Sequence, residues 1–434
     1  MPEQPTVAVF PEPGAWGPTN SLVSLSNGLR ERGMRVVFVI EESFKGELEK
    51  RGFEEALIRV GPPPEHEEQV GEGWAEFIRV TAPEFRKPTI EQLETVTAPI
   101  VEELAGGSKY AHDRMMEIWD DVRPDLIVVD NVMSAPAVLV AGVPWVRMVS
   151  ANPLEMQDPE IPPVFSGYPS DDRSGWDEFR AESRRLLDPL IADLSEFNQS
   201  KGAPPLPEGM FQYESPWLNM YLYPGLIDYP RATPLGHNWH RLDTSVRADD
   251  PAFDVDERLP GDGKVIYLSL GSLGCMDVGL MQSFIDVLDR TEHRVIVSMG
   301  PMHEQLRLGE RMYGEPFLPQ PSVLPQCDLL ITHGGNNTIA EAFLFGVPVI
   351  VAPLFWDQYD NAQRVHETGF GQRLPSYTFE DEELLRAVER LLADEQLARR
   401  MTEISAELSA APGRIKGADL IEQLVRTGEA VPVA

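Results

Sequence analysis

The sequence predicts an α/β protein made of two doubly wound parallel-sheet domains that face each other across a cleft. Three observations predict this fold class. Short β-branched runs alternate with longer helical patterns, these runs are apolar throughout, and the alternation occurs twice along 434 residues. Continuous apolar runs are typical of strands buried on both faces, and strands that alternate with helices form parallel sheets. A chain of this length can also supply two hydrophobic cores.

The predicted strands fall into two groups, one in each half of the chain. In the first half they cover residues 6–10, 35–40, 125–130, 144–150 and 217–223. In the second half they cover residues 265–270, 294–299, 328–332 and 348–353. Each group predicts one sheet with helices on both of its faces.

The predicted domain boundaries follow changes in composition. Residues 1–235 form the first domain, and residues 264–410 form the second. Between them, residues 236–263 are polar, contain proline and lack periodicity, which predicts an interdomain linker. The last segment, 411–434, contains an amphipathic helix that we expect to pack back on the first domain.

Two segments of the first domain are longer than simple crossovers between strands. They cover about 61–110 and 151–215, and both contain proline-rich stretches. We interpret them as loops and short helices that decorate the sheet. Insertions at the carboxyl ends of strands usually shape a ligand pocket.

The charge and the cysteine content exclude several classes of protein. The net charge is −33, with 70 acidic and 37 basic residues, so a nucleic-acid or anionic-membrane surface is not expected. Cys275 and Cys327 lie far apart and form no CxxC pair, which argues against a disulfide framework and favours a reducing compartment. The chain shows no signal peptide and no apolar run long enough to span a bilayer, so we expect a cytoplasmic protein.

The most informative segment of the sequence runs from Phe317 to Ala362. A buried strand, "DLLIT", leads through the small turn "HGGNNT" into a helix that ends at "GVP". Unpaired N–H groups and the helix dipole favour an anion at such a helix start, most simply a diphosphate. His333 lies at the end of the strand and adds a hydrogen-bond donor, and Gly335 allows close approach of the backbone.

A reading without any ligand also fits these residues. Thr338 and Glu341 form the pattern T-x-x-E, which is a capping box at a helix start. Paired glycines and asparagines are ordinary turn residues. Neither GxGxxG after the first strand nor GxxxxGK[ST] occurs, so dehydrogenase and P-loop readings lose their main support.

The order and spacing of the motifs resemble the nucleotide-sugar-binding signature of the UDP-glycosyltransferases. This is an inverting GT-B family, glycosyltransferase family 1, which includes bacterial macrolide and natural-product glycosyltransferases. The matches are "LPQ" at 318–320, "THGGNNT" at 332–338, Glu341, "GVP" at 346–348, Pro353 and "DQ" at 357–358. The two-domain pattern extends the resemblance over nearly the whole chain.

The resemblance implies a set of donor-binding residues in the second domain. Phe317 replaces the tryptophan that stacks on the base in the family. A phenyl ring can still stack there, so we expect the base to bind, with weaker affinity or with relaxed selectivity between uridine and thymidine. The implied groups are Gly271, Ser272, His333, Gly335, Asn336, Asn337 and Thr338 at the diphosphate, Glu341 at the ribose, Phe317, Leu318 and Gln320 at the base, and Trp356, Asp357 and Gln358 at the sugar.

The first domain departs from the family at one catalytic position. The stretch "GAWGP" resembles the family's G-H-x-x-P, and Ala15 stands where the family has its catalytic histidine. Asp130 matches the aspartate that orients this histidine, although an aspartate after a strand is also a routine helix N-cap. The nearest histidines in the sequence are His66 and His112.

Three explanations for Ala15 stay open at the level of sequence. The chain is an engineered His-to-Ala version, or it uses another base, with Asp130 and Glu12 the nearest candidates, or its acceptor is acidic enough to need little help. Loss of a general base typically costs a factor of about 10²–10⁴ in rate. We favour an active natural variant, because the bulky Trp16 also departs from the family pattern.

The resemblance implies an inverting hexosyltransferase that moves a hexose, with glucose expected, from a UDP-sugar to a hydroxyl of the acceptor. No metal and no cofactor beyond the nucleotide sugar are implied. Four aromatic residues of first-domain loops are candidates for the acceptor site, although ordinary core packing also explains each one. They are Trp16, Phe85, Phe165 and Tyr168. They favour a small aromatic, polyketide or terpenoid acceptor. A non-catalytic nucleotide-sugar-binding protein is the rival reading, and the sequence leaves open a monomer or a homodimer.

Overall fold

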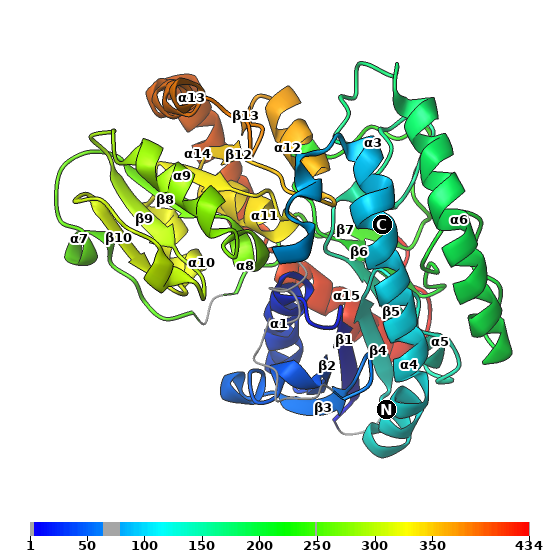
Figure 1. Ribbon diagram of the computed structural model, residues 1–434. Coiled ribbons are helices and arrows are strands. Elements are labelled where there is room, and N and C mark those ends of the chain that lie inside the picture. Colours follow the sequence, from blue (N-terminus) through cyan, green and yellow to red (C-terminus); the bar gives the residue numbers. More distant parts are fainter. Residues whose placement is uncertain (1–3, 64–78, 248–249, 434) are drawn as a thin grey trace.

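The computed structural model describes residues 4–63, 79–247 and 250–433, which form two lobes that are each built on one parallel sheet (Figure 1). Within these residues the first sheet has the order β3-β2-β1-β4-β5-β6-β7, and every strand pair in it is parallel. Its strands are β1 Thr6–Pro11, β2 Arg35–Glu41, β3 Glu54–Ile58, β4 Leu126–Asp130, β5 Trp145–Val149, β6 Leu218–Tyr221 and β7 Trp239–Arg241.

The second sheet repeats this arrangement in the order β10-β9-β8-β11-β12-β13, again with parallel pairs. Its strands are β8 Val265–Ser269, β9 Arg294–Ser298, β10 Met312–Glu315, β11 Leu329–Thr332, β12 Val349–Val351 and β13 Gly371–Arg373. In both sheets the strand order reverses beside the first strand, between β1 and β4 and between β8 and β11. Ligands of such sheets bind beyond the carboxyl ends of the strands at this switch point.

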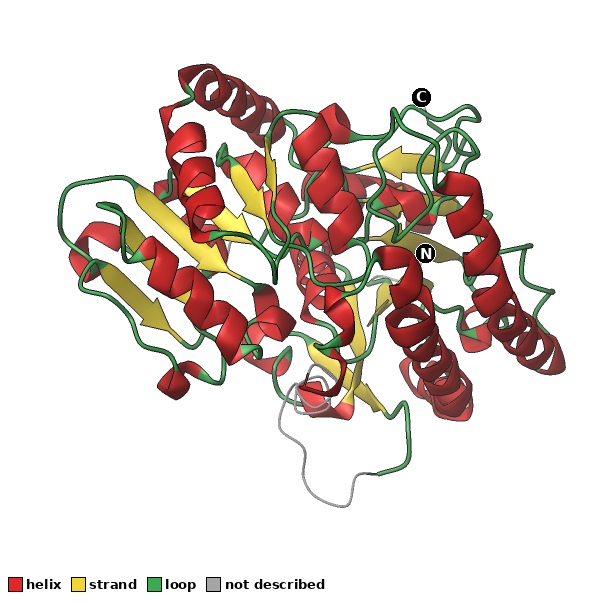
Figure 2. Ribbon diagram, turned by 45° about the horizontal axis from the view of Figure 1, so that its top comes forward, coloured by secondary structure: helices red, strands yellow, loops and turns green. Residues whose placement is uncertain are grey.

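Helices cover both faces of the two sheets (Figure 2). The predicted class of two Rossmann-like domains is therefore confirmed. The helices of the first half are α1 Trp16–Glu31, α3 Thr89–Gln92, α4 Ala98–Val122, α5 Pro136–Leu139 and α6 Trp176–Ser200. Those of the second half are α7 Val255–Arg258, α8 Gly271–Gly274, α9 Val278–Leu288, α10 Gln320–Val323, α11 Asn336–Phe345, α12 Gln358–Glu367, α13 Asp381–Ala393, α14 Glu395–Ala410 and α15 Gly413–Thr427.

Burial explains why the inner strands form where they do. Every residue of β4, β5 and β8 is buried, as a strand with helices on both faces requires. Local signals then place the ends of the helices. The side chain of Asp277 accepts a hydrogen bond from the backbone N–H of Leu280 at the start of α9, and Gly346 ends α11 in the left-handed conformation.

Two expectations about the first half need correction. Residues 239–241 of the predicted linker form β7, which pairs with β6, so the first sheet extends into that segment. The insertions predicted as loops and short helices contain α4 and α6, which are 25 residues long each and pack on one another. The helix α6 continues through Pro189, although a proline normally breaks or kinks a helix interior.

The terminal helix α15 packs on α1 of the first domain, as the red helix beside the dark blue one shows (Figure 1). Ala418, Ile421 and Leu424 are buried in the same core cluster as Val7 of β1. Lys416 Nζ donates a hydrogen bond to the carbonyl of Arg241, 2.9 Å away. The last helix therefore ties the end of the chain to the first sheet.

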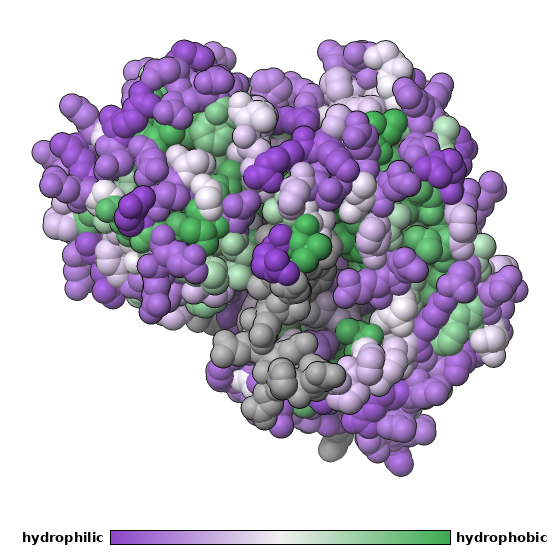
Figure 3. All heavy atoms as spheres, viewed as in Figure 1, coloured by the Kyte–Doolittle hydropathy of each residue, from purple (hydrophilic) through white to green (hydrophobic). Residues whose placement is uncertain are grey.

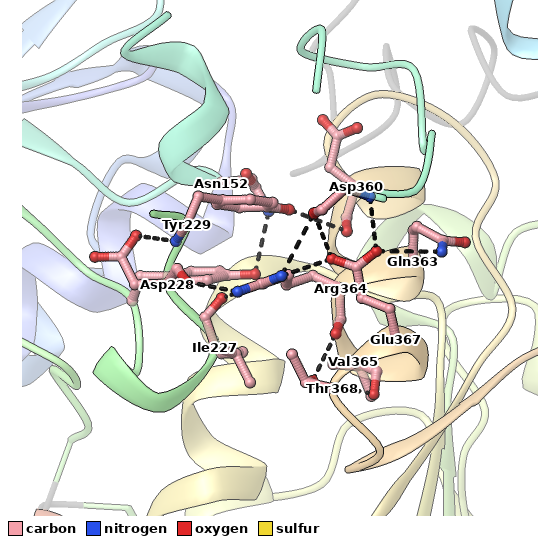
Figure 4. Close-up of polar contacts among 12 residues, drawn as sticks. Asn152, Ile227, Asp228, Tyr229, Asp360, Gln363, Arg364, Val365, Glu367 and Thr368 are labelled. Atoms are coloured by element: carbon pink, nitrogen blue, oxygen red, sulfur yellow. Dashed lines mark hydrogen bonds and ion pairs between the residues drawn. The ribbon is translucent and has the colours of Figure 1, made fainter. Parts of the chain in front are cut away.

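The helix α12 joins the two domains through a polar network (Figure 4). Arg364 Nε donates to the carbonyl of Ile227 at 2.7 Å and its Nη2 donates to that of Asp228 at 2.6 Å. Asp360 accepts hydrogen bonds from the backbone N–H groups of Phe165 and Gly167 at 2.7 and 2.8 Å. The domains thus meet through buried, directed contacts and not through loose packing.

The face of the molecule in Figure 3 is mostly hydrophilic, with hydrophobic residues scattered among polar ones. This agrees with the acidic composition of the chain. None of the helices in the described residues is long and apolar enough to cross a membrane.

Candidate active site

His333 lies directly after β11, at the switch point of the second sheet, and two glycines hold its ring. A Cβ atom added at Gly271 would lie 2.7 Å from Nε2 of His333, and one added at Gly335 would lie 2.8 Å from the same atom. Gly271 also has φ of +71°, which disfavours other residues. Burial lowers the pKa of His333 to about 4, so the imidazole is neutral at pH 7. A neutral imidazole in this place can donate one hydrogen bond to an anion without being a cation itself.

The helix α11 begins beside this ring, with Gly335 as its N-cap and no side chain capping its first N–H groups. These groups and the helix dipole form an anion site. The side chains of the two asparagines face the first domain instead. Asn336 Nδ2 donates to the carbonyls of Ser150 and Leu222 at 2.8 Å each, and Asn337 Nδ2 donates to that of Gly17 at 2.7 Å. Their carboxamides therefore join the two domains, and only their backbone faces the helix start.

The acidic residue of α11 does not form a capping box. Glu341 is buried, and its Oε2 accepts a hydrogen bond from Nε2 of Gln320, which also lies 3.3 Å from Oγ1 of Thr338. The capping-box reading is wrong, because Thr338 lies in the first turn of α11 and not at its N-cap. Burial raises the pKa of Glu341, and the charge of Arg247 opposes this shift. A buried carboxylate that is held by an amide can accept hydrogen bonds from a diol.

An exposed aromatic residue lies three residues before Gln320, which donates to this buried carboxylate. Phe317 is 68% exposed, although a phenylalanine usually buries its ring. It lies between β10 and α10, and Leu318 beside it packs partly against the core. Ser272 follows Gly271 in α8. An exposed ring three residues before Gln320 provides a flat surface on which a base can stack.

The residues predicted to read the sugar lie at the start of α12. Asp357 Oδ2 accepts from the backbone N–H of Asn152 at 2.9 Å, and burial raises the pKa of Asp357 to about 6. Gln358 Oε1 accepts from the backbone N–H of Leu354 at 3.0 Å. Trp356 has φ of +60°, an uncommon conformation for a bulky residue that often marks a functional site.

Two carboxylates of the first domain meet at its own switch point. Glu12 follows β1 and Asp130 ends β4, where Pro11 and Asp130 are paired in register. Asp130 Oδ1 accepts from the backbone N–H of Ser150 at 3.1 Å. The N-cap reading of Asp130 is wrong, because the next helix, α5, begins at Pro136. Burial raises the pKa of Asp130 to about 7 and that of Glu12 to about 8.

The sequence reasoning missed the ion pair that lies beside these acids. Arg147 Nη2 contacts Glu155 Oε1 at 2.6 Å, and the Arg147 side chain is almost completely buried in β5. Its charge favours ionised Asp130, and that of Glu155 opposes it. An arginine inside the apolar run "PWVRMVS" was the available signal, because a buried arginine needs a buried acid. Nothing in the sequence around Asn152 indicated that its backbone N–H donates to Asp357.

No histidine replaces Ala15 among the described residues near α1. Ala15 is the N-cap residue of α1 and offers no side-chain hydrogen bond. His112 lies on α4 with its ring edge-on to Phe197 at 5.9 Å. His66 lies outside the described residues. Glu12 and Asp130 are the ionisable groups that the structure brings to this strand end.

The four aromatic residues suggested for the acceptor are all in ring contacts. Trp16 lies 4.7 Å from Phe44 within the first domain, and Tyr168 lies 5.4 Å from Phe179. Both contacts are ordinary packing. The other two reach across the domain interface, where Phe85 stacks on Phe355 at 5.0 Å and Phe165 lies 4.2 Å from Trp356. Phe85 is buried, whereas Trp16, Phe165 and Tyr168 are partly exposed. Of these, Phe165, whose φ is +68°, lies next to Trp356 at the predicted sugar end of the site.

Acidic residues, histidines and cysteines do not gather into a metal-ligand set in the part of the chain that the structure describes. Both cysteines are free, and burial raises their pKa values.

Comparisons with known proteins find glycosyltransferases among the relatives of this chain. The profile of a family described as erythromycin biosynthesis protein CIII-like, C-terminal domain, matches residues 283–425. A zeaxanthin glucosyltransferase of Pantoea ananas is 24% identical over 344 residues, which cover 76% of this chain and 79% of that protein. An NDP-glycosyltransferase of Bacillus subtilis (strain 168) is 23% identical over 432 residues, which cover 96% of this chain and 97% of that protein.

Solved structures show the same fold over nearly the whole chain. The glycotransferase of kitacinnamycin has a TM-score of 0.72 at 20% identity and covers 98% of this chain and 100% of that one. A spinosyn rhamnosyltransferase complexed with thymidine diphosphate has a TM-score of 0.66 at 20% identity, with 96% and 99% covered. These matches show that the chain has the GT-B fold, and together with the ordered motifs of residues 317–362 they support the resemblance to glycosyltransferase family 1.

Proposed function

We propose that this protein transfers a hexose, with glucose first among the candidates, from a UDP- or TDP-sugar to a hydroxyl of a small apolar natural product. The observation that carries the proposal is the arrangement around α11. A neutral His333 lies beside an uncapped helix start, the buried Glu341 is held by Gln320, and the exposed Phe317 lies three residues before Gln320; we assign these groups to the diphosphate, the ribose and the base. The curated relative named above as an NDP-glycosyltransferase and the neighbour that holds thymidine diphosphate support a nucleotide-sugar donor.

In the proposed reaction the acceptor oxygen attacks the anomeric carbon from the side of the first domain. The bond from that carbon to the diphosphate breaks, and the nucleoside diphosphate keeps its electron pair. The start of α11 and His333 offset the growing charge, as preorganised dipoles do in many enzymes. A single displacement inverts the anomeric carbon. We propose no role for a metal ion or a further cofactor in this step.

The rival proposal is a nucleotide-sugar-binding protein without transferase activity, and Ala15 is the observation that favours it. The two proposals agree on donor binding and differ only in the fate of the sugar. Aromatic Phe165 at the domain interface is our candidate for contact with an apolar acceptor, next to Trp356.

Calorimetric titration with UDP and TDP tests donor binding, with wild type compared to His333→Ala. His366→Ala, which removes an exposed histidine of α12, is the matched control. We expect binding by wild type and the control and weaker binding by His333→Ala. Incubation of wild type with UDP-glucose, TDP-glucose and a panel of phenolic and macrocyclic acceptors, analysed by mass spectrometry, then tests transfer. Binding without any loss of sugar from the donor would select the rival proposal.

A further inference from the structure

The acids at the switch point of the first domain occupy the position that a base for the transfer needs. Glu12 leaves β1 and Asp130 ends β4, and these neighbouring strands mark the reversal of strand order where ligands bind in such sheets. The backbone N–H of Ala15 donates to the carbonyl of Glu12 at 3.3 Å, so Glu12 lies one turn before the residue that replaces the family's histidine.

The same turn faces the donor site of the second domain. Asn337 Nδ2 donates to the carbonyl of Gly17 at 2.7 Å, and Ser21 Oγ donates to Oδ1 of Asn337 at 2.7 Å. The start of α1 is therefore fixed against the start of α11, where the diphosphate is proposed to bind. A group just before α1 lies on the acceptor side of the scissile bond.

The hydrogen bonds of the two carboxylates leave acceptor positions unused. Glu12 Oε2 accepts from the backbone N–H of Val132 at 2.6 Å, which fixes the side chain. Its other oxygen, Oε1, is not fully buried and has no hydrogen-bond partner within the described residues. Asp130 is 5% exposed, and its Oδ2 is buried and likewise lacks a partner within the described part of the chain. An unpartnered buried oxygen is costly, so it indicates a group that arrives with the ligand.

The burial of Glu12 and the charges around it bring its pKa into the range that proton transfer needs. The charges of Asp130 on β4 and of Glu155 after β5 act on Glu12, and Glu155 is itself paired with Arg147 on β5. Burial is the main cause that raises the pKa of Glu12 to about 8, and the charges of Asp130 and Glu155 add to it. A general base is most effective when its pKa lies near the working pH.

We propose that Glu12 is the general base of this enzyme and takes over the role of the missing histidine. The inference rests on the proposed transfer reaction. As the acceptor oxygen forms its bond to the anomeric carbon, its proton passes to Oε1 of Glu12. The electron pair of the broken bond leaves with the nucleoside diphosphate, and Glu12 later releases the proton to water.

The test compares wild type, Glu12→Gln and the double variant Glu12→Gln with Ala15→His. Glutamine keeps an oxygen for the N–H of Val132 but cannot take a proton. Glu55→Gln is the matched control, because Glu55 also accepts backbone N–H groups, from Gly46 and Leu48 at 2.7 Å each, but lies on β3. The probes are UDP-glucose or TDP-glucose with 4-methoxyphenol, which keeps its proton at pH 8, and with 4-nitrophenol, which has lost it.

We expect Glu12→Gln to lower transfer to 4-methoxyphenol by a factor of about 10²–10⁴, as is usual when a general base is lost. Transfer to 4-nitrophenol should fall far less, because that acceptor needs no base. In wild type, kcat/KM for 4-methoxyphenol should rise with pH through about 8, where Glu12 ionises. In Glu12→Gln this rise of kcat/KM with pH should be absent. The added histidine should restore part of the rate.

Several results would overturn the assignment. Equal rates of wild type and Glu12→Gln on 4-methoxyphenol exclude Glu12 as the base, and equal losses on both phenols indicate a structural role. If wild type only hydrolyses the donor, water is the acceptor that loses a proton. The rates of hydrolysis by wild type and by Glu12→Gln are then compared, and equal rates exclude Glu12 as the base. Wild type that binds UDP but neither transfers nor hydrolyses refutes both the base and the transfer, whereas wild type that fails to bind UDP or TDP refutes the proposed function at its first step.

Discussion

Replacing Gly271 by alanine should disturb the diphosphate site through a collision that the structure makes explicit. The added Cβ would lie 2.7 Å from Nε2 of His333, and closer still to Cε1, while φ stays at +71°. The left-handed backbone costs an L-residue about 1–2 kcal/mol. Overpacking adds about 1–3 kcal/mol, because Gly335 also lies close against the ring and leaves it little room to move. We therefore expect a loss of about 2–5 kcal/mol in stability unless the ring moves.

A ring that moves relieves the strain but no longer reaches the diphosphate. A hydrogen bond to a charged group is worth about 1.5–3 kcal/mol, so UDP binding should weaken roughly 10- to 100-fold. Urea unfolding measures the first effect and calorimetry the second. Gly33→Ala is the matched control, because Gly33 has φ of +78° but nothing within 4 Å of an added Cβ. The variant Gly33→Ala should lose only about 1–2 kcal/mol of stability, which is the cost of the left-handed backbone, and its UDP binding should be unchanged. Wild-type stability and UDP affinity in Gly271→Ala would refute the reasoning.

Two further predictions concern the binding of the nucleotide's base and the pH dependence of stability at the domain interface. Phe317→Ala should weaken UDP binding by about 1–3 kcal/mol, the usual value of one base–aromatic stack, while Phe317→Trp should not weaken it; calorimetry measures both. Asp360→Asn should reduce the pH dependence of stability. Burial raises the pKa of Asp360 from 3.8 to about 8, so between these values the folded protein keeps a proton that the unfolded chain releases, and stability falls as pH rises. Urea midpoints from pH 5 to 8 should fall more steeply in wild type than in the variant, and parallel curves would contradict this.

The inner strands of both sheets could be predicted from the sequence, whereas the edge strands could not. All nine predicted runs became strands, and the four strands missed were β3, β7, β10 and β13, which are the outer strands of the two sheets. An edge strand is covered by a neighbour on one side only, so its residues need not be continuously apolar. The segment "EEALI" of β3, which is largely unburied, gives no continuous apolar signal.

The donor motif could be located from the sequence because its chemistry is local. The strand end, the glycines and the helix start are adjacent in the chain, and the structure keeps them adjacent around His333. The side-chain roles of Asn336 and Asn337 were not local. Their partners are carbonyl groups of Gly17, Ser150 and Leu222, which belong to the other domain. Such pairings depend on how two domains meet, and a pattern within one segment does not contain that information.

The interface and the sugar site share residues, and this constrains how the enzyme can work. Asp357 Oδ2 accepts the N–H of Asn152 from the first domain, yet a carboxylate has lone pairs for further donors. A sugar hydroxyl that reaches the same carboxylate therefore binds a group already oriented by the first domain. Asp360, one turn along α12, anchors the loop that carries Phe165. Because α12 joins both functions, we expect a sugar bound to Asp357 to lie in a fixed position relative to the first domain, where Glu12 is the proposed base.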